Sequence, residues 1–222
     1  RRQRFSVQLR QDAHAKIFVR NRQERAERQL RPPVNTHFLE FFRAQRDRLG
    51  RSVPARDSLE IMRSLTAVRA LLCDFDSVAE MPVVEFLDSG LTDPLLELLA
   101  PAFHRLDPLI TRDCLLILSN VSVCDRDSLA WLHARGLFAL LSDFLDTRFD
   151  TEIIYNAVWT FANFVGESHV YREAMQREGA WERLFALRGA VAGGPERLWF
   201  VLAWLFSNAM CGKVAPAAAL VV

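Results

Sequence analysis

An aromatic or leucine side chain precedes an asparagine by four residues at three separate places in this 222-residue chain. The pairs are Leu116 and Asn120, Trp159 and Asn163, and Trp204 and Asn208. Residues four apart lie on one face of a helix. An indole face attracts a cation by about 0.5–2 kcal/mol, and an asparagine amide carries both a hydrogen-bond donor and an acceptor. Such a surface is suited to an extended peptide whose Lys or Arg stems lie between rings.

The three asparagines are 43 and 45 residues apart, and Gly90, Gly136 and Gly179 repeat with similar spacing. Each glycine precedes a stretch that reads as an amphipathic helix. A period of about 40–47 residues built from helices is typical of armadillo and related solenoids. The sequence therefore predicts an all-α fold, a right-handed armadillo-repeat superhelical solenoid.

Apolar spacing of 3.6 residues, together with capping residues, predicts the helices of this solenoid. Asp57 and Ser58 precede the first of them as candidate N-caps. The predicted helices cover residues 58–73, 83–90, 92–103, 109–123, 127–135, 137–145, 151–165, 168–178, 180–188 and 196–210. They group into three full repeats and a partial leading one.

Charge divides the chain. Residues 1–31 hold ten Lys/Arg and three acids, whereas the whole chain has a net charge of only +1. We interpret residues 1–31 as a basic helical or disordered arm and residues 57–222 as armadillo repeats truncated at the C-terminus. Residues 32–56 read as a Pro- and Gly-marked linker, in which FLEFF (38–42) can pack as a short helix. A basic arm on a mildly acidic body favours an acidic partner or a return of the arm onto the body.

Several function classes find no support in the sequence. The four cysteines are scattered and the five histidines lack metal-ligand spacing, so no metal or cofactor is predicted. No nucleophile elbow, P-loop or dinucleotide-binding fingerprint is present, so we do not expect an enzyme. No apolar run of 18 residues occurs, and no membrane span is predicted.

Residues 156–187 and 202–213 resemble consecutive repeats of importin-α, the adaptor that carries basic nuclear localisation signals into the nucleus. The likeness includes the Trp-x-x-x-Asn pattern and Gly166–Glu167 after it. At the amino terminus, RRQRF, VQLR (7–10) and RNR (20–22) resemble the importin-β-binding segment of that family. The sequence therefore looks like the importin-β-binding segment and first repeats of an importin-α, as a fragment.

The resemblance implies a groove lined by Trp and Asn, an importin-β partner, cargo proteins with Lys/Arg-rich signals, and shuttling between cytoplasm and nucleus. The implied signal-binding residues are Leu116, Asn120, Trp159, Asn163, Glu167, Trp204 and Asn208. The implied importin-β-binding residues are Arg1, Arg2, Arg4, Val7, Leu9, Arg10, Arg20 and Arg22.

Two departures from the family pattern affect one end of the groove. Leu116 stands where the family has a tryptophan, and Cys124 where it has a glycine. We therefore expect weaker or altered signal preference there. Two alternatives stay open: an armadillo scaffold that binds another extended peptide, and a helical protein that binds nucleic acid.

Overall fold

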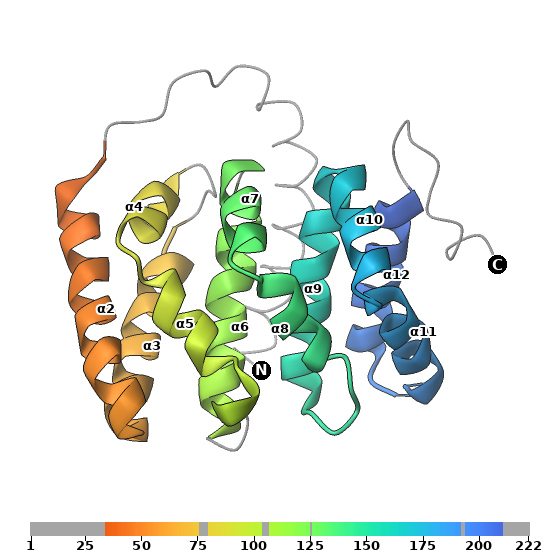
Figure 1. Ribbon diagram of the computed structural model, residues 1–222, viewed down its shortest axis with the longest axis horizontal. Helices are drawn as coiled ribbons and strands as arrows, with labels where there is room; N and C mark the ends of the chain where they lie inside the picture. Colours follow the sequence, from red (N-terminus) through yellow and green to blue (C-terminus); the bar gives the residue numbers. More distant parts are fainter. Residues whose placement is uncertain (1–33, 76–79, 104–106, 125, 192–193, 211–222) are drawn as a thin grey trace.

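The computed structural model describes residues 34–75, 80–103, 107–124, 126–191 and 194–210 (Figure 1). The basic arm predicted over residues 1–31 lies outside these ranges. Within them all regular structure is helical. The helices are α2 (Thr36–Ala55), α3 (Ser58–Cys73), α4 (Val83–Asp88), α5 (Thr92–Leu98), the 3-10 turn η2 (Pro101–Phe103), α6 (Pro108–Ser122), α7 (Arg126–Ala134), α8 (Leu137–Asp143), α9 (Thr151–Glu167), α10 (His169–Arg177), α11 (Ala180–Ala190) and α12 (Glu196–Met210).

The helices predicted from residue 58 onward are confirmed, most within two residues at each end. Aspartates begin three of them. The carboxylates of Asp57, Asp107 and Asp150 accept hydrogen bonds from backbone N–H groups in the first turns of α3, α6 and α9. Such caps satisfy donors that a helix start leaves without partners. The predicted helix 92–103 ends early, at Leu98, because Pro101 lacks an N–H and disfavours helical geometry in the residue before it.

The interpretation of residues 32–56 as a linker is wrong. Thr36–Ala55 forms α2, whose Phe42, Leu49 and Val53 are fully buried. A glycine inside a helix costs only about 1 kcal/mol, whereas burying each of these side chains contributes about 1.5–3 kcal/mol. Gly50 therefore does not break the helix, and Pro54 falls in its last turn, where little helix remains to be disrupted.

Contacts from α2 to the next repeat hold it in place. The Glu85 carboxylate accepts a hydrogen bond of 2.6 Å from the Asn35 N–H at the start of α2. Farther along, Arg46 Nη1 donates to the Ser89 carbonyl at 2.9 Å, beside the α4–α5 turn. These polar contacts accompany an apolar one between α2 and α4, the edge-to-face pair of Phe42 and Phe86.

Three helical triplets follow α2 and α3, namely α4–α5–α6, α7–α8–α9 and α10–α11–α12 (Figure 1). Between the first two helices of each triplet lies a glycine with positive φ, which is +76° for Gly90, +79° for Gly136 and +69° for Gly179. Side chains other than glycine rarely adopt this conformation without strain. The recurring glycines therefore mark the same turn in each repeat.

The helices form two layers. In Figure 1, α4, α5, α7, α8, α10 and α11 lie in front of α3, α6, α9 and α12. The rear helices pack in chain order, α3 on α6, α6 on α9, and α9 on α12. Aromatic edge contacts join the layers, as where Phe138 of α8 meets Phe161 and Phe164 of α9 with ring centroids 5.2 and 4.7 Å apart. Each rear helix thus buries its apolar faces against its neighbours in the stack.

None of the described helices combines the length and the apolar character needed to cross a bilayer.

Candidate functional site

The helices α6, α9 and α12 each present one stripe of residues in the same order. We call this surface the ladder face. On each helix the ladder face consists of the asparagine and the residues four, eight and eleven positions before that asparagine. Residues with these spacings lie on one face of a helix. They are, by row, Asn120, Asn163 and Asn208; Leu116, Trp159 and Trp204; Arg112, Tyr155 and Phe200; and Leu109, Glu152 and Arg197.

The asparagine row links each rear helix to the one before it. Asn163 Nδ2 donates to Ser122 Oγ at 2.8 Å and to the Ser119 carbonyl at 3.4 Å, both on α6. Asn208 Nδ2 donates to the Ala162 carbonyl of α9 at 3.0 Å. The Nδ2 groups of these buried amides therefore join α9 and α12 to the preceding repeat.

Asn120 makes a weaker link of the same kind. Its Nδ2 lies 3.7 Å from Cys73 Sγ, at the end of α3. A thiol sulfur is a poorer acceptor than a carbonyl oxygen. The first junction of the ladder face is thus held less firmly by its asparagine than the second and third.

In the row one turn before the asparagines, which we call the ring row, α9 and α12 carry an aromatic ring and α6 does not. Trp159 is buried in the middle of α9 and stacks on Tyr155, with centroids 5.8 Å apart and ring planes 23° apart. Trp204 is half-buried on α12, and Phe200 one turn before it is 48% exposed. Leu116 on α6 is half-buried and brings no ring. Aromatic surface therefore belongs to the α9–α12 part of the ladder face.

A cation already occupies part of this aromatic surface. The guanidinium of Arg197, from α12, lies 3.8 Å from the centre of the Tyr155 ring and pairs with the Glu152 carboxylate. Ring and carboxylate together satisfy one positive charge, through cation–π attraction and ion pairing. The α9–α12 junction thus holds one guanidinium of the protein between a ring and a carboxylate.

Glu167, the acid that follows the Trp159–Asn163 pair, is placed at the end of α9 with its side chain 13% exposed. Its carboxylate lies 3.7 Å from Arg126 Nε, at the start of α7. The acid therefore has a cationic neighbour within the protein, which offsets part of the charge it offers to a ligand.

The α3–α6 end holds two arginines around one acid. Asp113, with its side chain 2% exposed, lies between Arg69 Nε at 3.3 Å and Arg112 Nη2 at 3.2 Å. A buried carboxylate needs such partners, because its desolvation is costly. The group of three side chains carries a net charge of +1.

The sequence reasoning missed Arg112, Asp113, Tyr155, Glu152 and Arg197. A signal for some of them was available, since Glu152 and Arg197 stand 45 residues apart, as Asn163 and Asn208 do. Extending the repeat comparison two turns before the tryptophans would have aligned these positions. That Arg197 reaches back to the ring of the previous repeat is visible only in the packed structure.

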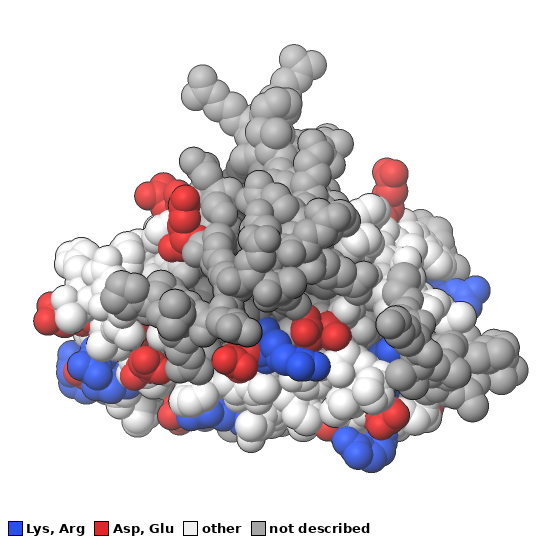
Figure 2. Space-filling model, turned by 90° about the horizontal axis from the view of Figure 1, so that it is seen from above, with Lys and Arg blue, Asp and Glu red and all other residues white. Residues whose placement is uncertain are grey.

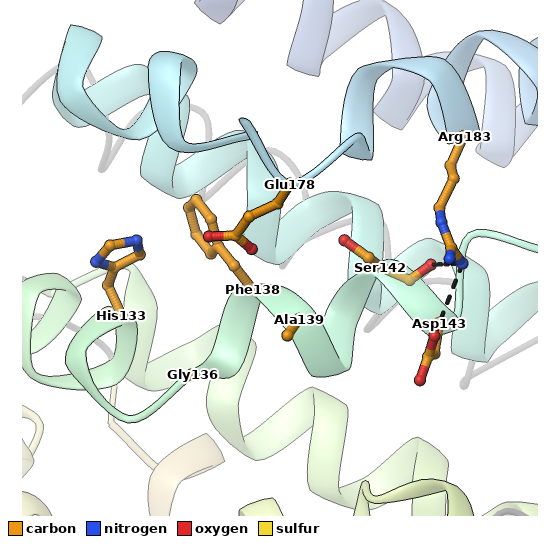
Figure 3. A pocket seen from close by; sticks show the side chains of 8 residues that line it. All are labelled: His133, Gly136, Phe138, Ala139, Ser142, Asp143, Glu178 and Arg183. Atoms are coloured by element: carbon orange, nitrogen blue, oxygen red, sulfur yellow. Dashed lines mark hydrogen bonds and ion pairs between the residues drawn. The ribbon is translucent and has the colours of Figure 1, made fainter. Parts of the chain in front are cut away.

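A hollow of about 370 Å³ lies in the front layer, between α8 and the turn joining α10 to α11 (Figure 3). Arg183 Nη1 there donates to the Ser142 carbonyl at 3.1 Å and lies 3.7 Å from Asp143. The Arg183 guanidinium therefore already has partners within the protein at this side of the hollow. None of the residues predicted for ligand binding lines this hollow.

Basic and acidic side chains are interspersed over the described surface visible in Figure 2. Binding to a nucleic-acid backbone calls for a stripe of cationic side chains. The described part of this view shows no such stripe.

No protein-family model and no curated protein matches the sequence. Solved structures do match the fold. A designed armadillo repeat protein in complex with the peptide (KR)4 is similar with a TM-score of 0.63 and 17% identity, over 76% of this chain and 64% of that one. Computationally designed armadillo repeat proteins for modular peptide recognition give a TM-score of 0.64 and 17% identity, over 77% and 65%.

At this identity the likeness shows the fold. The described part of the chain is an all-helical armadillo-repeat solenoid, which confirms the predicted fold class. The matched region spans about two thirds of the length of these designed proteins.

Proposed function

We propose that this protein is a nuclear import adaptor, which binds basic nuclear localisation signals as extended peptides on the ladder face. The observation that carries the proposal is the placement of Trp159 and Trp204 one turn before Asn163 and Asn208 on adjacent rear helices. The resemblance of residues 156–187 and 202–213 to importin-α repeats supports the same function. Residues 1–31 would link the bound cargo to importin-β.

Each part of the ladder face has a role in this function. The aliphatic stem of a ligand Lys would lie against Trp159 or Trp204, and Glu167 would attract its ammonium. The Oδ1 atoms of Asn163 and Asn208 would accept hydrogen bonds from the peptide backbone. Because backbone atoms are common to all residues, the asparagines would position the peptide and the rings would select its side chains.

The designed armadillo repeat protein solved with the peptide (KR)4 supports this mode by analogy, since its fold holds a peptide of alternating Lys and Arg. Arg197 on the Tyr155 ring supports it from within the chain.

The alternative is an armadillo scaffold that binds a different extended peptide. Leu116 and Arg112 favour this alternative. A basic signal requires an aromatic ring or a negative charge to hold its cations, and neither residue provides one. This alternative predicts that a Lys-rich peptide fails to bind and that peptides of another composition compete for the same face.

Titration of a fluorescent Lys-rich signal peptide tests the proposal. We expect W159A and W204A each to weaken binding about 2- to 30-fold, the equivalent of one cation–π contact. Trp131 provides the matched control, since it lies on α7 in the front layer with Arg135 stacked 3.6 Å from its ring centre. W131A should leave the affinity unchanged. Failure of the peptide to bind, or equal losses in all three variants, would contradict the proposal.

The carrier function of residues 1–31 needs its own measurement. We expect importin-β to bind the full chain and to lose that binding when residues 1–31 are removed. If the arm also competes for the ladder face, the Lys-rich peptide should bind the shortened chain more tightly. An importin-β affinity unaffected by the deletion would overturn this part of the proposal.

A further inference from the structure

We infer that the α3–α6 end of the ladder face binds an acidic side chain, a carboxylate or a phosphorylated serine, that flanks the basic run of the peptide. The inference rests on the proposed function, because it concerns the same bound peptide. It predicts that this protein prefers signals in which charge changes sign along the chain.

The two guanidiniums around Asp113 have hydrogen-bonding capacity to spare. Arg112 uses Nε and Nη2 toward one carboxylate oxygen, at 3.3 and 3.2 Å, and Arg69 turns Nε toward the other at 3.3 Å. In the described ranges, neither arginine has another ion pair or hydrogen bond. Arg112 Nη1 and both Nη atoms of Arg69 are thus available, on side chains about one third exposed.

The charge of this group disfavours a basic ligand residue. Two cations share one carboxylate, whereas at the α9–α12 junction Arg197 has Glu152 to itself. A ligand Lys above Arg112 would meet a like charge and no ring, since Leu116 occupies the ring row on α6. An oxyanion would instead accept the free guanidinium donors in a charge-assisted hydrogen bond.

The surroundings suit the rest of such a residue. Leu109 on α6 is 42% exposed. A shallow hollow of about 400 Å³ runs along α3 and is lined by Leu59, Met62, Arg63, Thr66, Ala67 and Ala70. Leu109 stands one helical turn before Arg112 and so offers apolar surface to the aliphatic part of a flanking side chain.

The distance between rear helices sets the spacing of the two charges. Packed helix axes lie about 8–10 Å apart, and an extended peptide advances about 3.3 Å per residue. The acidic residue should therefore stand about two to three residues from the lysine that contacts Trp159. Peptides that carry the acid before or after the basic run show in which direction the bound peptide runs along the ladder face.

The experiment measures affinities of the full chain for Lys-rich peptides with four kinds of flanking residue by titration at fixed salt. They carry alanine, glutamate, phosphoserine or lysine at the flanking position, with spacings of two to four residues and on both sides. We expect glutamate and phosphoserine to bind about three- to tenfold more tightly than alanine at one side and spacing, and lysine more weakly. The ratio of glutamate to phosphoserine identifies which oxyanion is preferred.

The variant R112Q should lower the ratio of the affinity for the glutamate-flanked peptide to that for the alanine-flanked peptide to about one, whatever it does to the affinity for the alanine-flanked peptide. R63Q is the matched control, because Arg63 lies in the hollow on α3 but pairs with Glu60, and it should keep the gain. Equal affinity for all four flanks on the unmodified chain would overturn the inference and leave the proposed function standing. So would a gain that survives R112Q. Absence of binding to every peptide would instead overturn the proposed function.

Discussion

At the scale of single residues, the asparagines of the ladder face join neighbouring repeats. Asn163 is 2% exposed and its amide hydrogens reach two acceptors on the preceding repeat. A residue that joins repeats through Nδ2 can still present Oδ1 to a peptide. The sequence pattern alone identifies the position but not this division between the two ends of the amide.

Replacing Asn163 therefore tests its structural role without a ligand. We expect N163A to lower the free energy of unfolding by about 1–3 kcal/mol, because the buried Ser122 Oγ loses the donor that Asn163 Nδ2 supplies. Chemical denaturation followed by circular dichroism measures this change. N120A is the control and should cost less, since the Asn120 amide lies 3.7 Å from the Cys73 sulfur, a weak acceptor. Equal losses in both variants would contradict the assignment.

The cysteines differ in reactivity at the same scale. Cys114 is fully buried on α6, and its burial raises the pKa of its thiol well above the usual range. Because the thiolate is the reactive form, this thiol should stay protonated and resist alkylation across pH 7–9. Cys73 is only half-buried. Mass spectrometry after brief iodoacetamide treatment should find Cys73 labelled before Cys114 in the folded protein, and both labelled in denaturant. Early labelling of Cys114 would show that α6 is not packed as described.

At the scale of elements, the helix ends were predictable because they depend on local chemistry. Asp57, Asp107 and Asp150 act as N-caps, and Gly90, Gly136 and Gly179 turn the chain, as their residue types indicate. The helix α2 was not predictable by the same reasoning. Its Gly50 and Pro54 are local signals for a break, whereas the core contacts of Phe42 and Leu49 that outweigh them come from distant parts of the chain.

Two glycine substitutions distinguish a glycine inside a helix from a glycine that turns the chain. Gly50 lies inside α2 with open space where the methyl group of an alanine would stand, so G50A should stabilise the fold by about 0.5–1 kcal/mol. Gly136 also has open space, but its φ of +79° strains any side chain, so G136A should cost about 1–2 kcal/mol. Thermal denaturation of both variants should move the melting temperature in opposite directions. A loss of stability in G50A would argue against a helix at Thr36–Ala55.

At the scale of the whole molecule, the repeat period predicted the solenoid because each triplet must bury its apolar face on its neighbours. The period also predicted which helices carry the ladder. It did not predict the charge at each end, since that depends on side chains from two helices at once. Two ion pairs form only when adjacent rear helices pack, namely Asp113 with Arg69 and Glu152 with Arg197.

The ladder face as a whole therefore differs from one end to the other. Its α9–α12 part is aromatic and pairs cations with acids, whereas its α3–α6 part is aliphatic and carries two arginines for one buried acid. A peptide that spans both parts meets two different chemistries. This asymmetry distinguishes the proposed ligand from a uniform run of basic residues.

A double-mutant cycle between Trp159 and one peptide lysine tests the central claim most directly. The four affinities are those of the unmodified chain and W159A, each with the Lys-rich peptide and with a peptide in which that lysine is norleucine. We predict a coupling energy of about 0.5–2 kcal/mol for one lysine of the run, the value of a cation–π contact. A coupling near zero for every lysine, with the basic peptide still bound, would contradict the account of the ladder face.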